Sequence, residues 1–548
     1  NGRMKIISAA SLSISDIPEL KPAYPSKTSD KRKRYKSAYF QNICAFDIET
    51  TTIKEIEQAV MYVWQFSIDN ELVIIGRTWE EFKKLLRILK ACCGLKRRLL
   101  VFVHNLSYEF QFLSGIYHFD NDNVFCTESR KILYCVLDCL EFRCSYQLTN
   151  LSLDALTKRY NVEHQKLSGV DFDYSKQRYA WTELTEYETQ YIINDVLGLI
   201  ESINAIKELY RDDNYSLPLT ATGFVRRVCR ERMHSYYTYI KEIYPDYNVF
   251  RLLAAEFRGG NTHANRYYAG EVIRENGNSY DISSSYPSAQ CNRLFPVSPF
   301  QPIRNLSPKK LDKLIDRNYA CIFEAELTDV SLKDRYWSVP YIPLAKCSMY
   351  SEIVNDNGRI LSASKLRICL TDIDWQIICE EYTFSAVILE GYYSEYGKLP
   401  QPLIDCNIEF YKQKTQLKGI TGQELYYLKN KELLNSIYGM SCQSPVKQLI
   451  LFNDCLYEPE TVYTPEELLN RSRRRAFTAY QFACWTTSHA RAALEEGIKL
   501  AGDRLLYVDT DSVKVIGDLN FSAYNETQQQ LALQSGLFAK DKHGNIHY

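Results

Sequence analysis

Two aspartates stand one residue apart in the segment Tyr507-Val508-Asp509-Thr510-Asp511-Ser512. Apolar runs at residues 505–506 and 513–515 flank this segment, so the pattern predicts a β-hairpin with the aspartates at its tip. Residues two apart on extended backbone point to the same side, and neighbouring like charges raise each other's pKa unless cations lie between them. A divalent metal site explains the pair, and a solvated acidic turn is the alternative.

A second acidic turn lies upstream, at residues 280–288. It holds Asp281, Ser284 and Tyr286 in a predicted strand-to-helix turn. Residues 421–439, between the two acidic turns, predict a helix. Thr421 and Glu424 have the spacing of a capping box at its start. Gly439 suits the end of the same helix.

One face of that predicted helix combines a cation, an amide and aromatic rings. Helical spacing places Tyr427, Lys431, Asn435 and Tyr438 on it. Such a face offers a positive charge for a triphosphate and an aromatic ring for a base pair. An ordinary amphipathic helix with solvated Lys and Asn side chains is the alternative.

A further group of acids lies in the N-terminal part. Residues 43–50 predict a buried strand, whose alternation places Asp47 and Glu49 on one face. A helix with an apolar stripe follows later in the chain. Thr185 and Glu188 have the spacing of a capping box at its start. Tyr191 and Asp195 lie one turn apart on the same helix.

A short segment between the N-terminal acids and the turn at residues 280–288, Phe257-Arg258-Gly259-Gly260, combines a ring, a cation and two glycines, which let the backbone approach a phosphate closely. A plain turn between domains is its alternative.

In order and residue type, the segments around Asp281, Lys431 and Asp511 resemble motifs A, B and C of family B DNA polymerases. The Asp-x-Glu strand, the segment at residues 105–109 and the Tyr-x-x-x-Asp helix resemble the 3′→5′ exonuclease of proofreading polymerases. Residues 152–156 resemble the single-strand-binding motif of that domain, and residues 257–260 the template-binding Tyr-x-Gly-Gly motif. The resemblance implies a multidomain α/β and α+β fold, with a ribonuclease H-like exonuclease domain and the palm and fingers of a right-hand polymerase.

For synthesis, the resemblance implies two-metal phosphoryl transfer. Asp281 and Asp511 would hold two Mg²⁺ roughly 3.5–4 Å apart, with Asp509 assisting and Mn²⁺ as an alternative ion. Tyr286 would lie beneath the deoxyribose and collide with a 2′-hydroxyl. The implied nucleotide-binding residues are Ser284, Tyr286, Lys412, Lys414, Lys431, Asn435 and Tyr438.

For proofreading, the implied metal ligands are Asp47, Glu49, Glu109 and Asp195, with Tyr191 as a further catalytic residue. The implied DNA contacts are Asn105, Tyr108, Ser152, Leu153, Phe257, Arg258, Gly259, Gly260 and Thr510. The chain departs from the family at Glu109, where Asp is usual, and at Phe257, where Tyr is usual. The extra methylene of Glu109 moves its carboxylate by about a bond length, which alters the metal geometry.

The motif order predicts eight segments along the chain. They are a loosely structured basic lead-in (1–38), the exonuclease domain (39–210), a connector (211–280), a first palm part (281–299), an insertion (300–404), the fingers (405–442), a second insertion (443–478) and a second palm part (479–548). Basic runs lie at residues 31–34, 96–98 and 471–475. The third run is the best candidate for a DNA contact, because it lies between motifs B and C.

Composition limits the functional classes without selecting one. The length of 548 residues indicates several domains, and the net charge of −1 does not itself indicate nucleic-acid binding. Seventeen cysteines without a Cys-x-x-Cys pair indicate reduced core residues of an intracellular protein, expected in the host cytoplasm. Because no apolar segment approaches transmembrane length, no membrane partner is expected.

Within the family, the protein-primed branch of bacteriophages, adenoviruses and linear plasmids is the most similar. The resemblance rests on a first exonuclease acid at Asp47, a short interval to Asp281 and the two insertions. It implies a DNA primer–template, deoxynucleoside triphosphates and a terminal protein as partners. The chain ends soon after motif C, which predicts a fragment without a thumb. The alternative functions are an exonuclease with a disabled polymerase part and a non-catalytic scaffold that binds DNA or terminal protein.

Overall fold

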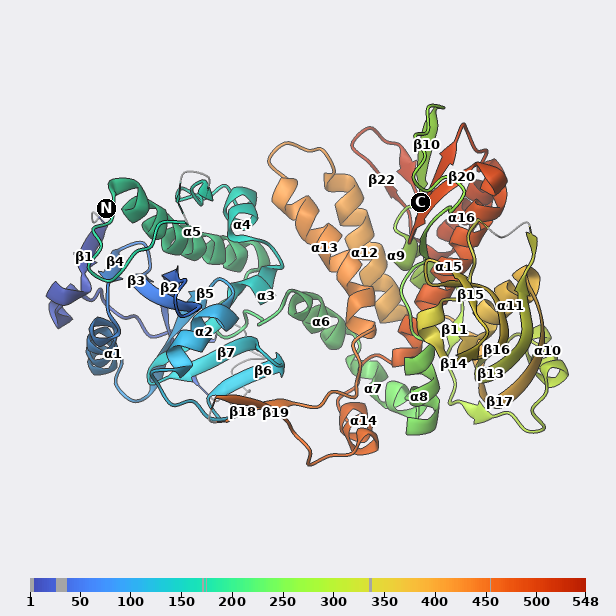
Figure 1. Ribbon diagram of the computed structural model, residues 1–548, viewed down its shortest axis with the longest axis horizontal. Coiled ribbons are helices and arrows are strands. Elements are labelled where there is room, and N and C mark those ends of the chain that lie inside the picture. The colour runs from blue at the N-terminus through green and yellow to red at the C-terminus, as the bar shows by residue number, and fades with distance from the viewer. Residues whose placement is uncertain (1–3, 26–36, 170–171, 174, 335–337, 454) are drawn as a thin grey trace. The chain divides into compact units, whose positions relative to one another are not determined.

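The computed structural model describes residues 4–25, 37–169, 172–173, 175–334, 338–453 and 455–548 (Figure 1). The chain divides into two compact units. Unit 1 comprises Asn1–Phe224 and Gln448–Val462, and unit 2 comprises Val225–Lys447 and Tyr463–Tyr548. The basic run at residues 31–34 lies outside the described residues. In the part of the chain that the structure describes, no helix combines the length and apolarity needed to span a bilayer.

Unit 1 is built around a ten-stranded mixed sheet with the order β1-β4-β3-β2-β5-β8-β7-β6-β18-β19. Its strands are β1 (Lys5–Ser8), β2 (Ala38–Ile53), β3 (Gln58–Ile68), β4 (Leu72–Gly76), β5 (Arg97–Val103), β6 (Val124–Glu128), β7 (Lys131–Leu137), β8 (Leu140–Cys144), β18 (Ile450–Asn453) and β19 (Leu456–Pro459). β2, β5 and β8 run parallel to one another at the centre. The middle of β2 is therefore buried, as its apolar sequence predicts.

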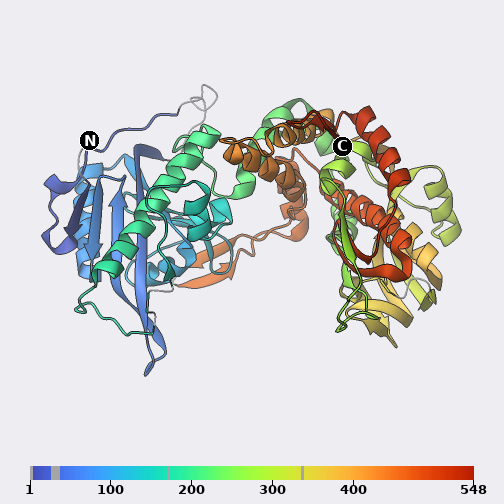
Figure 2. The same cartoon turned by 90° about the horizontal axis from the view of Figure 1, so that it is seen from above.

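Helices cover this sheet: α1 (Trp79–Cys93), α2 (Leu106–Ser114), α3 (Ser145–Thr149), α4 (Leu153–Arg159) and α5 (Glu186–Tyr210). The long helix α5 packs against β2 and β3 (Figure 2). Its N-terminus is capped by the Thr185 hydroxyl, which accepts a hydrogen bond from the Glu188 N–H at 3.1 Å. The Glu188 carboxylate in turn accepts one from the Thr185 N–H, so the predicted capping box is confirmed.

Two segments of unit 1 differ from the sequence expectation. The prediction of a loosely structured lead-in is wrong for residues 5–12, because β1 pairs with β4 and the side chains of Ala9 and Leu12 are buried. The second insertion is not one piece either. Its residues Gln448–Val462 belong to unit 1, where Ile450 of β18 pairs with Cys126 of β6. Phe452 is buried there and completes the core beside Phe110.

Unit 2 contains a four-stranded antiparallel sheet with the order β10-β21-β20-β9. Its strands are β9 (Thr262–Ala264), β10 (Gly277–Asp281), β20 (Leu505–Asp509) and β21 (Ser512–Ile516). β20 and β21 form the predicted hairpin, with Asp509 opposite Ser512. The segment expected to be a connector supplies β9 and almost all of β10, so it belongs to this sheet.

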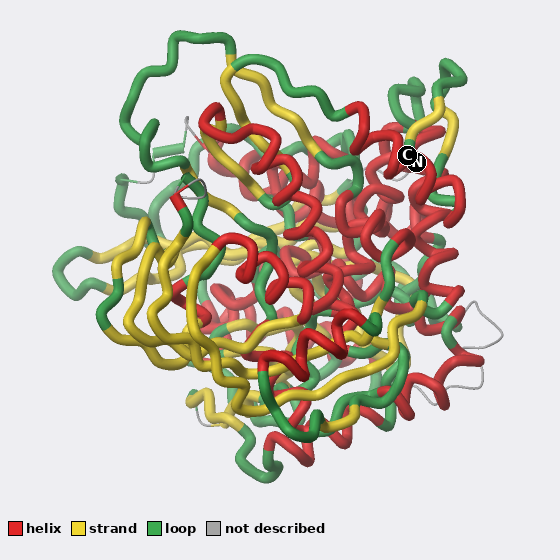
Figure 3. Tube along the Cα trace, turned by 90° about the vertical axis from the view of Figure 1, so that its right-hand side faces the viewer, coloured by secondary structure: helices red, strands yellow, loops and turns green. Residues whose placement is uncertain are grey.

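A seven-stranded sheet makes up most of the first insertion. Its main strands are β11 (Phe295–Pro296), β13 (Tyr319–Leu332), β14 (Cys347–Ser351), β16 (Arg359–Thr371) and β17 (Tyr382–Gly397), with β12 (Gln301–Pro302) and β15 (Val354–Asp356) at its margins. Helices α10 (Pro308–Asp316) and α11 (Asp372–Glu381) pack against it. The distribution of strand and helix can be followed in Figure 3.

The remaining helices of unit 2 are α7 (Tyr237–Ile243), α8 (Tyr247–Glu256), α9 (Ser285–Asn292), α12 (Gln401–Leu417), α13 (Glu424–Ser441), α14 (Pro465–Arg473), α15 (Tyr480–Ala501) and α16 (Ser522–Ser535). A short hairpin of β22 (Ala539–Lys540) and β23 (Ile546–His547) follows, and the unit boundary falls within α6 (Ala221–Arg232). α15 is buried along most of its length and packs against α8, α9, α11 and α13.

The predicted start of α13 is wrong. The helix begins at Glu424, and Thr421 does not cap it, because Gly422 adopts a left-handed φ of +81° where a capping box needs the first helical residue. Gly439 lies inside the helix rather than at its end, since α13 continues to Ser441. The pairing of α12 with α13 agrees with the helix pair expected for residues 405–442.

Candidate active sites

Three aspartates gather at one end of the four-stranded sheet. Asp281 ends β10 and pairs with Ser512 of β21, while Asp509 ends β20. The Ile282 N–H donates a hydrogen bond to the Asp511 carbonyl at 2.7 Å, which ties the two acidic turns together. Strand pairing therefore brings residues more than two hundred positions apart to the same sheet edge.

The segment before β9 forms hydrogen bonds with the hairpin tip. Thr510 adopts a left-handed φ of +58°, and its N–H donates to the carbonyl of Asn261 at 2.8 Å. The Asp509 carboxylate accepts hydrogen bonds from the hydroxyls of Thr262 and Thr510, each at 3.2 Å. These bonds fix the direction of Asp509 relative to the turn.

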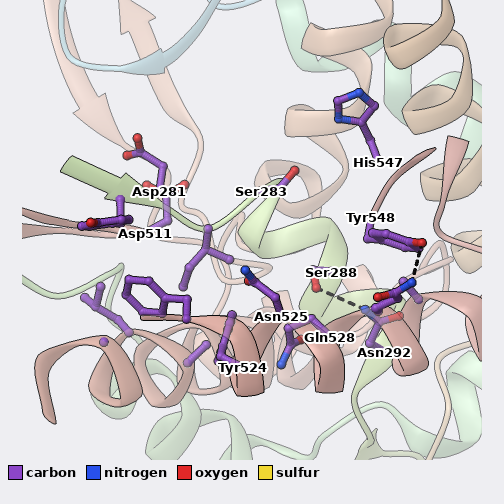
Figure 4. Close-up of a pocket in the computed structure, with 18 of the residues that line it drawn as sticks. Asp281, Ser283, Ser288, Asn292, Asp511, Tyr524, Asn525, Gln528, His547 and Tyr548 are labelled. Carbon is purple, nitrogen blue, oxygen red and sulfur yellow. Dashed lines mark hydrogen bonds between the residues drawn. The ribbon is translucent and has the colours of Figure 1, made fainter. Parts of the chain in front are cut away.

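The electrostatics at this edge favour a cation. Burial raises the pKa of Asp511, and the charges of Asp281 and Asp509 raise it further. Asp281 and Asp511 line a cavity of about 530 Å³, with Ser283, Ser288 and residues of α16 on its other sides (Figure 4). Hard carboxylate oxygens beside open space suit Mg²⁺.

Tyr286 and Tyr438 meet next to these acids. Their ring centroids lie 4.2 Å apart with the planes at 36°. Ser284 adopts a left-handed conformation immediately before α9, and Tyr286 in the first turn of α9 contacts Tyr438 of α13. The hydroxyl of Tyr286 also accepts a backbone hydrogen bond from Gly260.

The lysines of the two paired helices differ in position. The Lys414 ammonium donates to the Ser284 hydroxyl at 3.0 Å, and burial together with the positive charges of Lys418 and Lys431 lowers its pKa to about 8. Lys431 is exposed on α13, as is Asn435. The ammonium of Lys412 lies 5.9 Å from the ring centroid of Phe538 instead. The charges of Lys414 and Lys431 therefore act on each other, whereas the Lys412 ammonium lies against Phe538.

The loop after α8 packs against the hairpin tip. A Cβ added to Gly260 would lie 2.6–2.8 Å from atoms of Thr510, so only glycine fits at this position. A Cβ on Gly259 would meet nothing within 4 Å, so open space lies where a side chain would project. Close approach to the hairpin, rather than to a phosphate, thus explains the second glycine. The Phe257 ring lies 5.6 Å from that of Tyr480.

Arg258 does not offer its charge to solvent, contrary to the sequence expectation. Its guanidinium donates to the Tyr341 carbonyl at 3.2 Å and to Asp374 at 3.3 Å. Arg491, which is 1% exposed, donates to both oxygens of Asp374 and to the carbonyls of Arg258 and Gly259 at 3.0 and 3.1 Å. The loop is therefore held by a buried ionic cluster.

In unit 1, the predicted exonuclease acids converge. Oxygens of Asp47 and Glu49 on β2 and of Asp195 on α5 all lie within 4.8 Å of one another. Burial raises the pKa of Asp47 to about 7, with the charge of Asp195 adding to the shift, and it raises the pKa of Glu49 well above its usual range. Within the described residues, the oxygens of Asp281, Asp509 and Asp511 do not all lie within 4.8 Å of one another.

Glu109 lies beside this group on α2 and is buried. Burial and then the charge of Asp47 raise its pKa well above the usual range. Within the described residues, Glu109 Oε2 and Asp195 Oδ1 are buried and lack a hydrogen-bond partner. Orphaned buried oxygens in a carboxylate cluster fit a divalent cation as their missing partner.

Sequence reasoning missed Lys166. Its ammonium donates to Asp195 Oδ2 at 2.7 Å and lies 4.6 Å from the centroid of the Tyr191 ring. Burial alone would lower the pKa of Lys166, but the charge of Asp195 raises it. Gln65 was missed as well; its amide donates to Asp47 Oδ2 at 2.6 Å. Neither residue stands in a motif, so only the structure could identify them.

The other candidate DNA-contact residues of unit 1 differ in their exposure and in their contacts. Asn105 adopts a left-handed φ of +69° before α2, and Tyr108 exposes its ring while its hydroxyl lies 2.6 Å from that of Thr50. Ser152 caps α4 by accepting from the Ala155 N–H at 3.2 Å, and Leu153 is buried. Of these four, Tyr108 is best placed to stack on a nucleotide.

Most of the chain is similar in sequence to known proteins. The family described as "DNA polymerase type B, organellar and viral" matches residues 171–461, which is more than half of the 548 residues. The DNA polymerases of Bacillus phages Nf and phi29 are 22% and 23% identical, each over 86% of this chain and 79% of the relative.

Solved structures of Phi29 DNA polymerase share the fold. A complex with primer-template DNA superposes with a TM-score of 0.67, and a ternary complex that also holds incoming nucleotides with 0.64. Both are 17% identical and cover 89% of this chain and 82% of the solved chain.

Proposed function

The chain belongs to the organellar and viral type B DNA polymerases, and we propose that it extends a DNA primer with deoxynucleoside triphosphates and proofreads the product from its 3′ end. The observation that carries the proposal is the presence of two separate carboxylate sets, one in each unit. Synthesis is assigned to Asp281, Asp509 and Asp511. Proofreading is assigned to Asp47, Glu49 and Asp195, with Glu109 beside them.

The carboxylates would hold Mg²⁺, or Mn²⁺ in its place, in each site. Metal bound there would activate the attacking oxygen and stabilise the charge on the phosphoryl group. The protein's own contribution is to keep these oxygens together: strand pairing aligns Asp281 with the hairpin, and Gln65 and Lys166 orient the acids of unit 1. Such outer partners fix ligand direction and tune affinity.

Nucleotide selection is assigned to the contact between α9 and α13. Lys431 and Lys414 would offset the negative charge of the triphosphate, since Lys414 contacts Ser284 and the charge of Lys431 acts on Lys414. Tyr286 would lie under the sugar, held in place by Tyr438 and by the Gly260 N–H. A ring fixed from two sides is suited to rejecting a 2′-hydroxyl by collision.

A 5′-labelled primer on a longer template tests both activities in one assay. With Mg²⁺ and four deoxynucleotides the primer lengthens, without nucleotides it shortens, and a chelator stops both reactions. A primer of constant length in every condition would contradict the proposal.

Priming by a terminal protein is part of the proposal and is supported by the resemblance to the protein-primed branch. The reaction is transfer of a labelled deoxynucleotide to a protein hydroxyl on a template without a DNA primer. A label that stays on protein after denaturation is the expected result. Extension of DNA primers without any labelled protein would remove this part of the proposal and leave the polymerase assignment intact.

A further inference from the structure

Two glutamates meet in the interior of unit 2, outside both sets of proposed catalytic acids. Glu381 is the last residue of α11 and is 0% exposed, and Glu495 lies on α15 and is 2% exposed. The two carboxyl groups contact each other directly. The amide Nδ2 of Asn261, a residue that is 1% exposed, lies 3.5 Å from Glu495 Oε1. Three separate segments of the chain therefore bring polar side chains together at one buried point.

Most oxygens of this group lack a partner. Within the described residues, both carboxylate oxygens of Glu381, Glu495 Oε2 and Asn261 Oδ1 are buried without a hydrogen bond. In that part of the chain, no lysine, arginine or histidine forms an ion pair with either carboxylate. The ammonium of Lys499 pairs with the exposed Glu380 instead. The group is thus acidic, buried and without a balancing side chain.

Two negative charges at this point would be costly. Burial, followed by the charge of Glu495, raises the pKa of Glu381 to about 11, and burial raises that of Glu495 to about 7. The group therefore requires a positive charge, which a proton or a metal ion can supply. One shared proton would bridge one oxygen of each carboxylate. It would leave the second Glu381 oxygen and Asn261 Oδ1 without partners, which buried polar atoms rarely are.

A divalent cation accounts for all of these oxygens. It neutralises two ionised carboxylates, and a half-turn of the Asn261 amide, which exchanges its nitrogen and oxygen, directs Oδ1 toward Glu495. Carboxylate and amide oxygens are ligands of Ca²⁺, whereas Mg²⁺ gives up its water reluctantly and suits an interior site less well. The donor set and its burial therefore favour Ca²⁺.

We propose that Glu381, Glu495 and Asn261 form a structural Ca²⁺ site, separate from the two catalytic carboxylate sets. The site adjoins the acidic hairpin: the Asn261 carbonyl accepts a hydrogen bond from the Thr510 N–H at 2.8 Å, and α15 packs against β20 and β21. An ion bound there would join α11 and α15 to the segment that contacts the hairpin tip. The proposal concerns metal binding by the folded chain and does not depend on the polymerase assignment.

The experiment compares the parent with the double variant Glu381→Gln/Glu495→Gln. The control is Glu380→Gln/Glu496→Gln, which neutralises the exposed glutamate next to each site residue. Each protein is saturated with CaCl₂ and dialysed against calcium-free buffer, and elemental analysis then counts the retained calcium. Parent and control should retain about one calcium ion per chain more than the double variant. A calcium chelator should lower the Tm of parent and control by at least about 3 °C more than that of the double variant, because a ligand bound only by the folded state stabilises it.

Equal calcium contents, or equal Tm shifts on chelation, overturn the proposal. A Tm difference between parent and double variant that changes with pH but not with calcium assigns the pair to a shared proton instead. If the double variant does not fold, Glu495→Gln alone replaces it, and calcium retention like the parent's by that variant also overturns the proposal. Neither measurement requires catalysis, so a parent protein that fails to extend a primer leaves this result unaffected.

Discussion

The rings of Tyr286 and Tyr438 lie against each other, with centroids 4.2 Å apart, and so join the turn that carries Asp281 to the helix that carries Lys431. This contact fixes the position of the Tyr286 ring in the proposed nucleotide pocket. The Gly260 N–H holds the Tyr286 hydroxyl from the other side. Sugar selection should therefore depend on the position of one ring.

Tyr286→Val should increase ribonucleotide incorporation relative to deoxynucleotide incorporation by at least about tenfold, because removal of the ring removes the collision. Tyr286→Phe keeps the ring and loses only the bond from Gly260, about 0.5–1.5 kcal/mol, so selectivity should stay close to the parent's. Single-nucleotide extension with matched nucleotides measures both. Equal discrimination by the Val variant and the parent would make Tyr286 a packing residue.

Asp47→Ala should abolish Mg²⁺-dependent 3′→5′ degradation of single-stranded DNA, since it removes one of the clustered carboxylates. Glu109→Asp should keep or increase the rate and Glu109→Ala should lose it, if Glu109 is the remaining ligand. Glu55→Ala, which removes an exposed carboxylate of the same unit, is the control. A rate that is indifferent to both Glu109 changes would exclude Glu109 as a ligand.

Lys166→Gln should slow degradation by about 10–100-fold and leave primer extension unchanged, because the ammonium that orients Asp195 is lost. Titration of Mg²⁺ in the degradation assay should show a weaker apparent metal affinity. Lys158→Gln provides a control, since Lys158 is an exposed lysine of the same unit that pairs with Asp154 on its own helix. Parent-like degradation by Lys166→Gln would reduce Lys166 to a packing residue.

Arg491→Met should lower the free energy of unfolding by about 3–5 kcal/mol, because it leaves Asp374 and Glu256 buried without their main counter-charge. Denaturant titration measures the loss, and Arg317→Met should unfold like the parent. A loss below about 1 kcal/mol would show that the cluster does not stabilise the loop. Where the variant folds, weaker template binding is expected, since Arg491 also holds the carbonyls of Arg258 and Gly259.

Local patterns in the sequence predicted local structure well. The hairpin around Asp509 and the capping box at Thr185 depend on neighbouring residues and are present. The capping box at Thr421 failed for an equally local reason, because the left-handed Gly422 delays the start of the helix. Motif spacing also identified the acids that the structure gathers in unit 1.

Long-range relationships could not be predicted from spacing. The pair of Lys166 with Asp195 and the contact of Gly260 with Thr510 join segments whose separation carries no periodic signal. The assignment of residues 448–462 to unit 1 depends on one strand edge being completed by β18. Arg258 looked like a free cation because its partner Asp374 lies more than a hundred residues away.

The central claim is that Asp281 and Asp511 form a polymerase site that works independently of the acids of unit 1. The direct measurement is primer extension by Asp281→Ala and Asp511→Ala, alongside degradation of single-stranded DNA by the same preparations. Both variants should lose nucleotide incorporation and degrade single-stranded DNA at the parent's rate. Parent-like incorporation by either variant would contradict the assignment of the palm site.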